Sequence, residues 1–386
     1  MSKINENNPV IGYWMSERKR QKLNWSEFGK VCRYSGFELV KIDLERPLEG
    51  QGPFSVILHK LTEFIARNDQ QAISLIKSVE NYINSHPEIV VIDPIESVKI
   101  LLDRYRSYGI IARSRLNDID VFTPIYVELT SNNIAENIKK LQTYGVSFPF
   151  ICKPYVAQGT NDCHKMALIF NEKSIVDCKP PCVAQSFVNH NALLFKVFVV
   201  GDEYQVVERP SLKNFYPSDR STIFFDSHNV SKSDSSSQLS ILDPEDQAYV
   251  PRIDDKKLKT IVSVLREELN LTLFGIDIVV ENETGRHAII DINVYPGYDG
   301  FPNFFNSLMN CIKKKLMEKH KNLTAENRIN KTFLNCSVKV ETKLEQDDSG
   351  FDTCDSSDER KHRQLISSTS INSKMNTVSK KIVNRT

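Results

Sequence analysis

Short apolar runs alternate with amphipathic stretches along residues 10–100. Four of these runs are typical of strands: Val10–Trp14, Phe37–Ile42, Phe54–Leu58 and Ile89–Ile92. The apolar spacing of helices occurs in Trp25–Arg33, Leu61–Ile65, Ala72–Ile83 and Val98–Tyr105. Strands separated by helices indicate a parallel sheet that is covered by helices.

Basic residues follow two of these predicted strands. Residues 16–22 (Ser-Glu-Arg-Lys-Arg-Gln-Lys) come after the first strand, and His59 and Lys60 come after the third. Ligands gather at the carboxyl ends of parallel strands, so these side chains could converge on one crevice. The same spacing also fits the solvated face of a helix, and it does not decide between the two interpretations.

From about Phe122 the apolar runs are longer and follow one another closely. The strands predicted here are Val146–Cys152, Met166–Phe170, Val183–Val188, Leu193–Val200, Tyr204–Glu208, Phe274–Val280 and Ala288–Ile292. Neighbouring runs that are close enough to form hairpins favour a largely antiparallel sheet with helices on one side. Helices are expected at Asn133–Thr143 and Lys256–Asn270, and the Ser-rich stretch Ser227–Ser240 is expected to be a loop.

The charge is nearly balanced over the whole chain but not within it. The 386 residues include 50 Lys and Arg and 49 Asp and Glu; residues 321–386 hold 12 and 9 of these, which leaves the first 320 residues slightly acidic. This balance argues against bulk attraction to nucleic acid or to lipid, so any bound anion needs a local basic cluster. Beyond Lys321 a polar composition without periodicity predicts a disordered tail.

The sequence also favours a cytoplasmic location, with the nucleus as a second one, and a monomer that does not insert into membranes. Residues 1–9 lack the basic and apolar segments of a secretory signal, and no apolar run is long enough to cross a bilayer. The eight Cys residues are therefore expected to be reduced thiols. Cys163, His164, Cys178 and Cys182 could bind zinc, but their spacing fits no paired ligand pattern and favours small buried thiols.

Two apolar segments, residues 274–280 and 289–293, flank a turn-like stretch that ends at Gly285. In a hairpin, Asp277 lies close to opposite Asp291, and Asn293 shares the face of Asp291 because side chains alternate along a strand. Unpaired carboxylates in such apolar strands are unfavourable unless a hard cation binds them. Octahedral Mg²⁺, completed by substrate phosphates, suits these three oxygen ligands. Alternatively, the two aspartates cap turns or pair with Lys and Arg.

Lys153 and Lys196 each lie inside an apolar strand. Such a lysine either extends its ammonium group to solvent or meets an anion. Two of them near an acidic triad favour a nucleotide polyphosphate, which needs compensating cations. The polar segment 154–166, with Gly159 as its one glycine, could cover the phosphates. The glycine-rich motifs of P-loop and dinucleotide-binding proteins and the signature motifs of protein kinases are absent from the sequence.

A set of motifs, taken together, carries a family resemblance. The motifs are Gly12-Tyr13-Trp14, Phe150–Lys153, Asn189-His190-Asn191, Arg209–Phe215, Ser227–Lys232 and Asp291–Tyr298. Through them, residues 10–313 resemble the inositol-tetrakisphosphate 1-kinase family, whose members also act as inositol 1,3,4-trisphosphate 5/6-kinases. The resemblance implies an α/β (α+β) chain with an ATP-grasp fold. Its parts would be an N-terminal parallel α/β domain on the inositol phosphate side (1–115), a central lid domain (116–190), a mainly antiparallel C-terminal domain with the Mg²⁺ site (191–320) and the tail (321–386).

The resemblance also implies ATP and two Mg²⁺ ions as cofactors and assigns residues to them. ATP phosphates would contact Arg104, Lys153 and Lys196; the adenine edge would contact Gln185, Ser186, Phe187 and Val188; Ser211, Ser227 and Ser231 would complete the nucleotide site. Asp277, Asp291 and Asn293 would bind the metal. The inositol phosphate would contact Lys19, His59, His164, Lys196, Lys213, Asn293 and Gly297.

The implied reaction is transfer of the ATP γ-phosphate to the 1-hydroxyl of inositol 3,4,5,6-tetrakisphosphate and to the 5- or 6-hydroxyl of inositol 1,3,4-trisphosphate. A loose transition state needs alignment and charge neutralisation, so Lys153, Lys196 and Asp291 are expected to be catalytic, with His164 as the candidate general base. Two alternatives stay open. An ATP-grasp carboxylate–amine ligase would need an acceptor pocket for a carboxylate and an amine, and a non-catalytic inositol phosphate-binding protein would not need the acidic triad.

Overall fold

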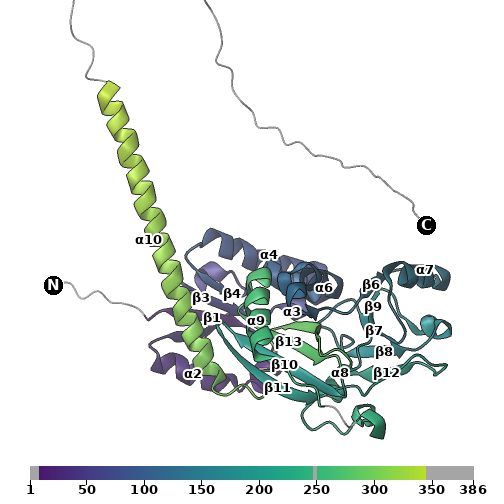
Figure 1. Cartoon of the computed structure of the whole chain (residues 1–386). Coiled ribbons are helices and arrows are strands. Elements are labelled where there is room, and N and C mark those ends of the chain that lie inside the picture. Colours follow the sequence, from purple (N-terminus) through teal and green to yellow (C-terminus); the bar gives the residue numbers. More distant parts are fainter. Residues whose placement is uncertain (1–7, 247–249, 345–386) are drawn as a thin grey trace, which may run out of the picture. The chain divides into compact units, whose positions relative to one another are not determined.

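The computed structural model describes residues 8–246 and 250–344, and the surroundings of side chains up to residue 325 (Figure 1). The chain divides into two units, Met1–Asn327 and Arg328–Thr386. The first unit contains three sheets. Of the second, the structure describes only the final part of helix α10 (Phe304–Leu344).

The N-terminal sheet is parallel, as predicted, with strand order β2-β1-β3-β4. Its strands are β1 (Val10–Trp14), β2 (Glu38–Lys41), β3 (Val56–His59) and β4 (Val90–Ile92). Its helices are α1 (Glu17–Lys22), α2 (Trp25–Tyr34), α3 (Thr62–Arg67), α4 (Gln70–Ser85), α5 (Ile95–Leu102) and α6 (Arg104–Arg113). The helix predicted at Val98–Tyr105 is present but is divided between α5 and α6. Extended Asp103 separates the two helices, and its side chain caps α6 by accepting from the amide of Arg106.

The antiparallel strands predicted from the apolar pattern form two sheets of five strands, in agreement with the separate lid and C-terminal domains that the family resemblance implies. The central sheet has the order β12-β8-β7-β9-β6, and the C-terminal sheet has the order β11-β10-β13-β14-β5. The chain leaves β9 for β10 through a turn in which Asn191 and Ala192 have positive φ angles of 52° and 56°. This local change of direction leaves β9 and β10 in different sheets, and the apolar pattern could not reveal it.

The central sheet carries its own helix and its own core. Its strands are β6 (Tyr126–Leu129), β7 (Phe150–Pro154), β8 (Lys165–Ile169), β9 (Cys182–Ser186) and β12 (Ile223–Asp226); the helices are α7 (Ile134–Tyr144) and α8 (Ser227–Ser231). The loop predicted at Ser227–Ser240 is wrong at its start. Asp226 caps α8 by accepting from the amide of Asn229, and Val230 is buried, so a short helix forms there.

The C-terminal sheet packs against the N-terminal domain. Its strands are β10 (Leu193–Val200), β11 (Glu203–Pro210), β13 (Leu273–Val280), β14 (His287–Val294) and the short parallel strand β5 (Val121–Phe122); α9 (Asp255–Leu269) and α10 also belong here. One core contains apolar residues of both domains, among them Ile11, Phe28, Phe195 and Ile276. The central sheet has separate cores. The predicted domain boundaries at residues 115 and 190 stay predictions.

The predicted boundary at Lys321 falls within α10, which continues to Leu344. The start of this helix is anchored by buried Leu308, Met309 and Ile312. Once such a nucleus is fixed, adding further turns costs little, and the following Lys, Glu, Leu and Ala residues favour helix. The segment to Leu344 is therefore helical rather than a tail without structure, and the rest of the predicted tail lies outside the described residues. In the part of the chain that the structure describes, no helix has the length and apolar character needed to cross a membrane.

His59 belongs to the packed interior and predicts a pH dependence of stability. It is 3% exposed, its Nε2 lies 2.7 Å from the carbonyl oxygen of Asp93, and burial lowers its pKa to about 4. Since the unfolded chain binds a proton near pH 6.5, protons favour the unfolded state as the pH falls through this window. Between about pH 7.5 and pH 5, His59 should remove about 2 kcal/mol from the free energy of unfolding.

Urea unfolding of the wild type and of His59→Gln at these two pH values tests this expectation. The glutamine keeps a donor for the Asp93 carbonyl but does not titrate. Stability of the variant should therefore fall less as the pH is lowered. Equal pH dependence in the two proteins would contradict the account.

Candidate active site

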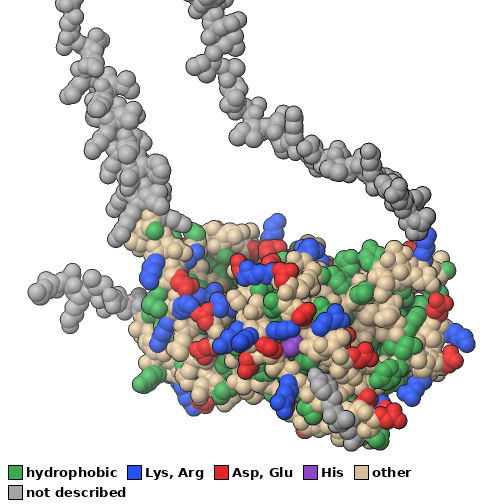
Figure 2. Space-filling model, viewed as in Figure 1, with side chains coloured by type: hydrophobic (Ala, Val, Ile, Leu, Met, Phe, Trp, Pro, Cys, Tyr) green, Lys and Arg blue, Asp and Glu red, His purple; other side chains and the backbone are tan. Residues whose placement is uncertain are grey.

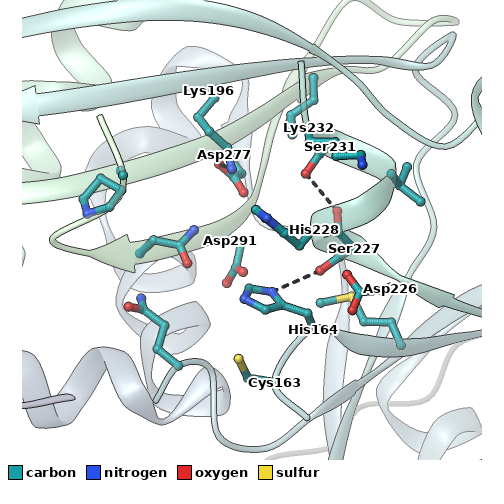
Figure 3. A pocket seen from close by; sticks show the side chains of 18 of the residues that line it. Cys163, His164, Lys196, Asp226, Ser227, His228, Ser231, Lys232, Asp277 and Asp291 are labelled. Atoms are coloured by element: carbon teal, nitrogen blue, oxygen red, sulfur yellow. Dashed lines mark hydrogen bonds and ion pairs between the residues drawn. The ribbon is translucent and has the colours of Figure 1, made fainter. Parts of the chain in front are cut away.

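One cavity, of about 1180 Å³, lies where the three sheets meet. Its walls come from the segment after β1, from the 158–164 segment and α8 of the central domain, and from β10, β13 and β14. Figure 3 shows His164 and His228 of the central domain and Lys196, Asp277 and Asp291 of the C-terminal sheet pointing into a common space. Figure 2 shows Lys, Arg, Asp and Glu side chains interspersed over the middle of one face, so charges of both signs lie close together there.

The acidic residues of the β13–β14 hairpin have the predicted register. Asp277 pairs with Asp291 across the two strands, and Asn293 pairs with Gly275, two residues further along β14. All three predicted ligands line the cavity. Asp277 Oδ1 lies 3.4 Å from the Nζ of Lys196, and Asp291 Oδ2 lies 3.6 Å from a guanidinium nitrogen of Arg104. The alternative of pairing with cations is thus also realised, in addition to the convergence of the oxygen ligands.

These carboxylates have oxygen atoms that the protein itself does not satisfy. Oδ1 of Asp291 is buried and accepts no hydrogen bond within the described residues, and the buried Oδ1 of Asp277 has only the ion pair with Lys196, at 3.4 Å. Burial raises the pKa of Asp277, while nearby Lys196 lowers it. Buried, unsatisfied carboxylate oxygens are unfavourable unless a cation or a donor reaches them. With the amide oxygen of Asn293, this donor set fits a hard cation such as Mg²⁺.

The described residues contain no group of three or more His, Cys, Asp and Glu side chains that could hold a metal ion. Cys163, Cys178 and Cys182 are buried free thiols, and Cys178 and Cys182 belong to the core of the central domain, whereas His164 lines the cavity. The three cysteines are therefore buried thiols, as predicted.

Lys153 does not extend to solvent. Its ammonium group is buried and donates to Gln185 Oε1 (2.6 Å), to the carbonyl oxygen of Ile290 (2.8 Å) and to the hydroxyl of Tyr108 (3.0 Å). Burial lowers its pKa to about 8, partly offset by Asp291. All three hydrogen-bond partners of this desolvated ammonium group are neutral. Its positive charge is therefore not neutralised by a hydrogen-bonded carboxylate, and an anion in the cavity would be attracted to it. Lys196, by contrast, is partly exposed and faces Asp277.

Arg104 does not reach the cavity but holds the backbone of residues beside it. It is 1% exposed, does not line the cavity, and donates to the carbonyl oxygens of Pro154, Val156 and Cys163. Together with its approach to Asp291, these bonds fix the start of the 154–163 segment against the hairpin. The predicted direct contact between Arg104 and ATP phosphates stays a prediction that the cavity lining does not favour.

The basic residues after β1 form a helix, and Arg18, Lys19 and Lys22 of this helix also line the cavity, so the two interpretations of this cluster are not exclusive. Lys19 donates to the carbonyl oxygens of Tyr295 and Pro296, and Lys60 donates to that of Tyr295 at 2.8 Å. Within the described residues neither ammonium group forms an ion pair. Burial lowers the pKa of Lys60 to about 8 and that of Lys19 well below its usual value, with mutual repulsion adding to the effect on Lys19. This wall of the cavity therefore presents two ammonium groups that can bind an anion.

His59 and Lys213 are not brought into the cavity. The His59 ring is buried against Asp93, and Lys213 bonds to the carboxylate of Asp243. The residue after His59, Lys60, lines the cavity in its place. Arg18, Lys22 and Lys60 belong to the basic clusters that were expected to face a common crevice, and they line the cavity. Arg67, Arg209, His228 and Lys232 also line it, and sequence reasoning assigned none of these four to a ligand.

The remaining predicted residues line the cavity. They are Gln185, Ser186, Phe187 and Val188 along one wall, Ser211, Ser227 and Ser231 beside it, and Lys19, His164 and Gly297 at the other end. Several are held by hydrogen bonds within the protein. Ser211 Oγ lies 2.8 Å from His190 Nε2, and Ser231 Oγ donates to the carbonyl oxygen of Ser227 at 2.8 Å. Burial lowers the pKa of His164, and neighbouring His228 lowers it further.

The segment before His164 is packed against α3, and Gly159 makes this possible. Gly159 has a φ angle of +89°, and a Cβ atom added to it would lie 2.5 Å from the carbonyl oxygen of Thr62. Gly159→Ala should therefore destabilise the fold by roughly 1–3 kcal/mol and displace the segment from the cavity. Thermal unfolding measures the first effect, and the KM values measure the second.

Gly285→Ala is a matched control for this prediction. Gly285 also has a positive φ angle, +70°, but an added Cβ would meet no atom within 4 Å. The Gly285→Ala variant therefore measures how much stability is lost through the positive φ angle alone, without a steric clash. A Gly159→Ala protein as stable as Gly285→Ala, with unchanged KM values, would contradict the packing role of Gly159.

Comparison with known proteins agrees with this geometry. Residues 10–98 match the pre-ATP-grasp domain of inositol 1,3,4-trisphosphate 5/6-kinase, and residues 116–314 match its ATP-grasp domain. An inositol-tetrakisphosphate 1-kinase from Xenopus laevis is 47% identical over 309 residues, which cover 78% of either chain. One from Danio rerio is 46% identical over 314 residues, covering 79% of this chain and 78% of its own.

Solved structures share the fold at low identity. D-alanine–D-alanine ligase from Bacillus anthracis superimposes with a TM-score of 0.50 at 14% identity, covering 81% of this chain and 98% of its own. A D-cycloserine synthetase superimposes with a TM-score of 0.53 at 12% identity, covering 80% and 99%. At this identity the similarity establishes the architecture alone.

Proposed function

The chain belongs to the inositol 1,3,4-trisphosphate 5/6-kinase family of ATP-grasp enzymes, and on that premise we propose the reaction and the residues that perform it. It is an inositol polyphosphate kinase that uses ATP. We propose that it transfers the γ-phosphate to the 1-hydroxyl of inositol 3,4,5,6-tetrakisphosphate and to the 5- or 6-hydroxyl of inositol 1,3,4-trisphosphate. The predicted monomeric state, cytoplasmic location with the nucleus as a second one, and lack of nucleic acid binding stay predictions.

One observation supports this acceptor most strongly. The acceptor wall of the cavity presents Lys19 and Lys60, two desolvated ammonium groups whose protein partners are main-chain carbonyl oxygens rather than carboxylates. Arg18, Lys22 and Arg67 line the same region. A carboxylate–amine ligase needs no such density of cations for its acceptor, whereas an inositol ring with three or four phosphates does.

The nucleotide would lie between the central and C-terminal sheets. Gln185–Val188 form the wall suited to the adenine edge, and Lys153 and Lys196 would neutralise the phosphates. Asp277, Asp291 and Asn293 would hold Mg²⁺; when bound, the metal neutralises charge on the nucleotide phosphates. A metal titration would measure whether the site takes the two ions that we predict.

The chain's own residues would perform three tasks in the transfer. Lys19 and Lys60 orient the inositol phosphate so that one hydroxyl faces the γ-phosphate in line with the leaving oxygen. Lys196 and Lys153 stabilise the negative charge that spreads over the phosphoryl oxygens. His164 lies at the cavity wall with a lowered pKa, so its neutral imidazole is suited to accept the hydroxyl proton.

Labelled ATP and a panel of acceptors test the proposal. The full chain is incubated with Mg²⁺, γ-labelled ATP and either a set of inositol phosphates or pairs of amino acids. We expect one labelled phosphate in the inositol product for each ADP formed. Label appearing only as inorganic phosphate together with a new amide would support the ligase instead, and acceptor binding without any transfer would support the non-catalytic alternative.

A further inference from the structure

His228 points into the cavity from the lid side, and none of the three tasks in the transfer uses it. It lies on α8, directly after Ser227. Its side chain reaches toward a space that is bordered by Lys196 and Asp277 on one side and by Asp291 and His164 on the other (Figure 3). The His228 and His164 rings are 5.7 Å apart between centroids and tilted by 37°. Two imidazoles from the central domain thus face the acidic hairpin.

The position of His228 is fixed by the elements around it. β12 and β8 pair so that Asp226 lies opposite Lys165. The amide of Ser227 donates to the carbonyl oxygen of His164 at 2.9 Å, and Ser227 Oγ lies 3.4 Å from His164 Nδ1. Buried Val230 anchors α8 from beneath. The backbone that carries His228 is therefore tied to the backbone that carries His164.

The surroundings of His228 point to an anionic ligand. Its ring nitrogens form no hydrogen bond or ion pair within the described residues, whereas Ser227 and Ser231 on the same helix are both engaged. Lys196, Lys22 and Arg18 face it, with Asp226 as the acidic neighbour. Burial, and next Lys22, lower its pKa, so near neutral pH it presents an uncharged N–H donor.

We propose that His228 is a further catalytic residue, whose imidazole N–H donates a hydrogen bond to the phosphoryl group during transfer, from the wall opposite Asp277 and Asp291. This rests on the proposed function and deepens it. The bond strengthens as negative charge grows on the phosphoryl oxygens, so it favours the transition state over bound ATP. Lys196, beside Asp277, supplies charge from the opposite wall, while His228 supplies direction without adding another cation.

Two substitutions separate this role from a structural one. His228→Leu removes the donor but keeps side-chain bulk, and His228→Gln restores a neutral N–H donor at a similar reach. The leucine variant should lose about 100-fold in kcat with KM values within threefold of wild type. The glutamine variant should recover at least tenfold of that loss. His320→Leu, at an exposed position of α10 that does not line the cavity, is the control and should match wild type.

A binding measurement gives a readout that does not depend on turnover. ADP with Mg²⁺, fluoroaluminate and the inositol phosphate mimics the transferring phosphoryl group. Its affinity for His228→Leu should fall by about the same factor as kcat, while the affinity for ATP stays within threefold.

Each outcome decides the proposal. Equal loss in the leucine and glutamine variants with lowered thermal stability, or kcat within threefold of wild type in His228→Leu, would overturn it and leave the kinase function standing. Failure of the wild type to phosphorylate any inositol phosphate would overturn both.

Discussion

Asp291→Asn should reduce kcat for inositol phosphate phosphorylation by at least about 1,000-fold while the protein stays folded. The substitution keeps the shape of the side chain but removes the charge that a hard cation requires at this position. It also leaves Arg104 beside a neutral amide, yet Arg104 retains its bonds to the carbonyl oxygens of Pro154 and Cys163. The loss should therefore come from chemistry rather than from unfolding.

The measurement is kcat at saturating ATP and inositol phosphate, with thermal unfolding in parallel and a titration of Mg²⁺. The Mg²⁺ concentration needed for half-maximal activity should rise in the variant. Asp299→Asn is the matched control, because Asp299 is a cavity carboxylate that pairs with Lys22 and is not one of the proposed metal ligands. It should stay within threefold of wild type. Full activity of Asp291→Asn would refute the metal site.

Lys19→Met should raise the KM for the inositol phosphate by about 10- to 100-fold and leave kcat within about threefold. Methionine keeps the buried stem of the side chain but removes the ammonium group. Because Lys19 has no acidic partner within hydrogen-bonding distance among the described residues, its charge is available to the substrate, and a charge-assisted hydrogen bond contributes about 1.5–3 kcal/mol. The KM for ATP should not change, since Lys19 lies on the acceptor side.

Lys30→Met is the control for this variant. Lys30 lies on α2, is exposed and pairs with Glu27, so its removal tests the effect of losing one positive charge at a distance. Its KM values should equal those of the wild type. If both variants raise the KM equally, long-range attraction rather than a specific contact explains the effect, and the role of Lys19 as a ligand is wrong.

Sequence reasoning succeeded where the relevant geometry is local. The hairpin that pairs Asp277 with Asp291 is built from two adjacent apolar segments, so the alternation of side chains is enough to predict which oxygens converge. The parallel sheet of residues 10–92 was predictable for a similar reason, because helices separate its strands in sequence.

Sequence reasoning failed where a strand is buried on both faces, because such a strand has no alternation of apolar and polar positions. All four residues of β3 are buried, so this strand carries no alternation to tell which side of it faces the ligand. The family resemblance assigned His59 to the substrate, and this buried strand gave no pattern to contradict it; the His59 ring turns into the core, while the next residue, Lys60, reaches the cavity. His228 was missed for another reason: a Ser-rich stretch indicates a loop, and the cap from Asp226 and the burial of Val230 that form α8 depend on tertiary contacts.

The division into two antiparallel sheets also depends on a feature without a composition signal. It follows from the positive φ angles of Asn191 and Ala192, and alanine has no intrinsic preference for that conformation. Arg104 illustrates a related limit. An arginine at the start of a helix carries no sequence signal that its guanidinium group is buried, yet that of Arg104 is buried and bonds to the backbone beside the cavity.

The central claim is direct, in-line transfer of the γ-phosphate to an inositol hydroxyl at this cavity. The most direct test is the stereochemical course with ATP that is chiral at the γ-phosphorus through oxygen isotopes, with the configuration of the phosphate on the inositol product as the readout. A single displacement predicts inversion of configuration. Retention of configuration would mean that the phosphate passes through a residue of the enzyme, and it would contradict the account.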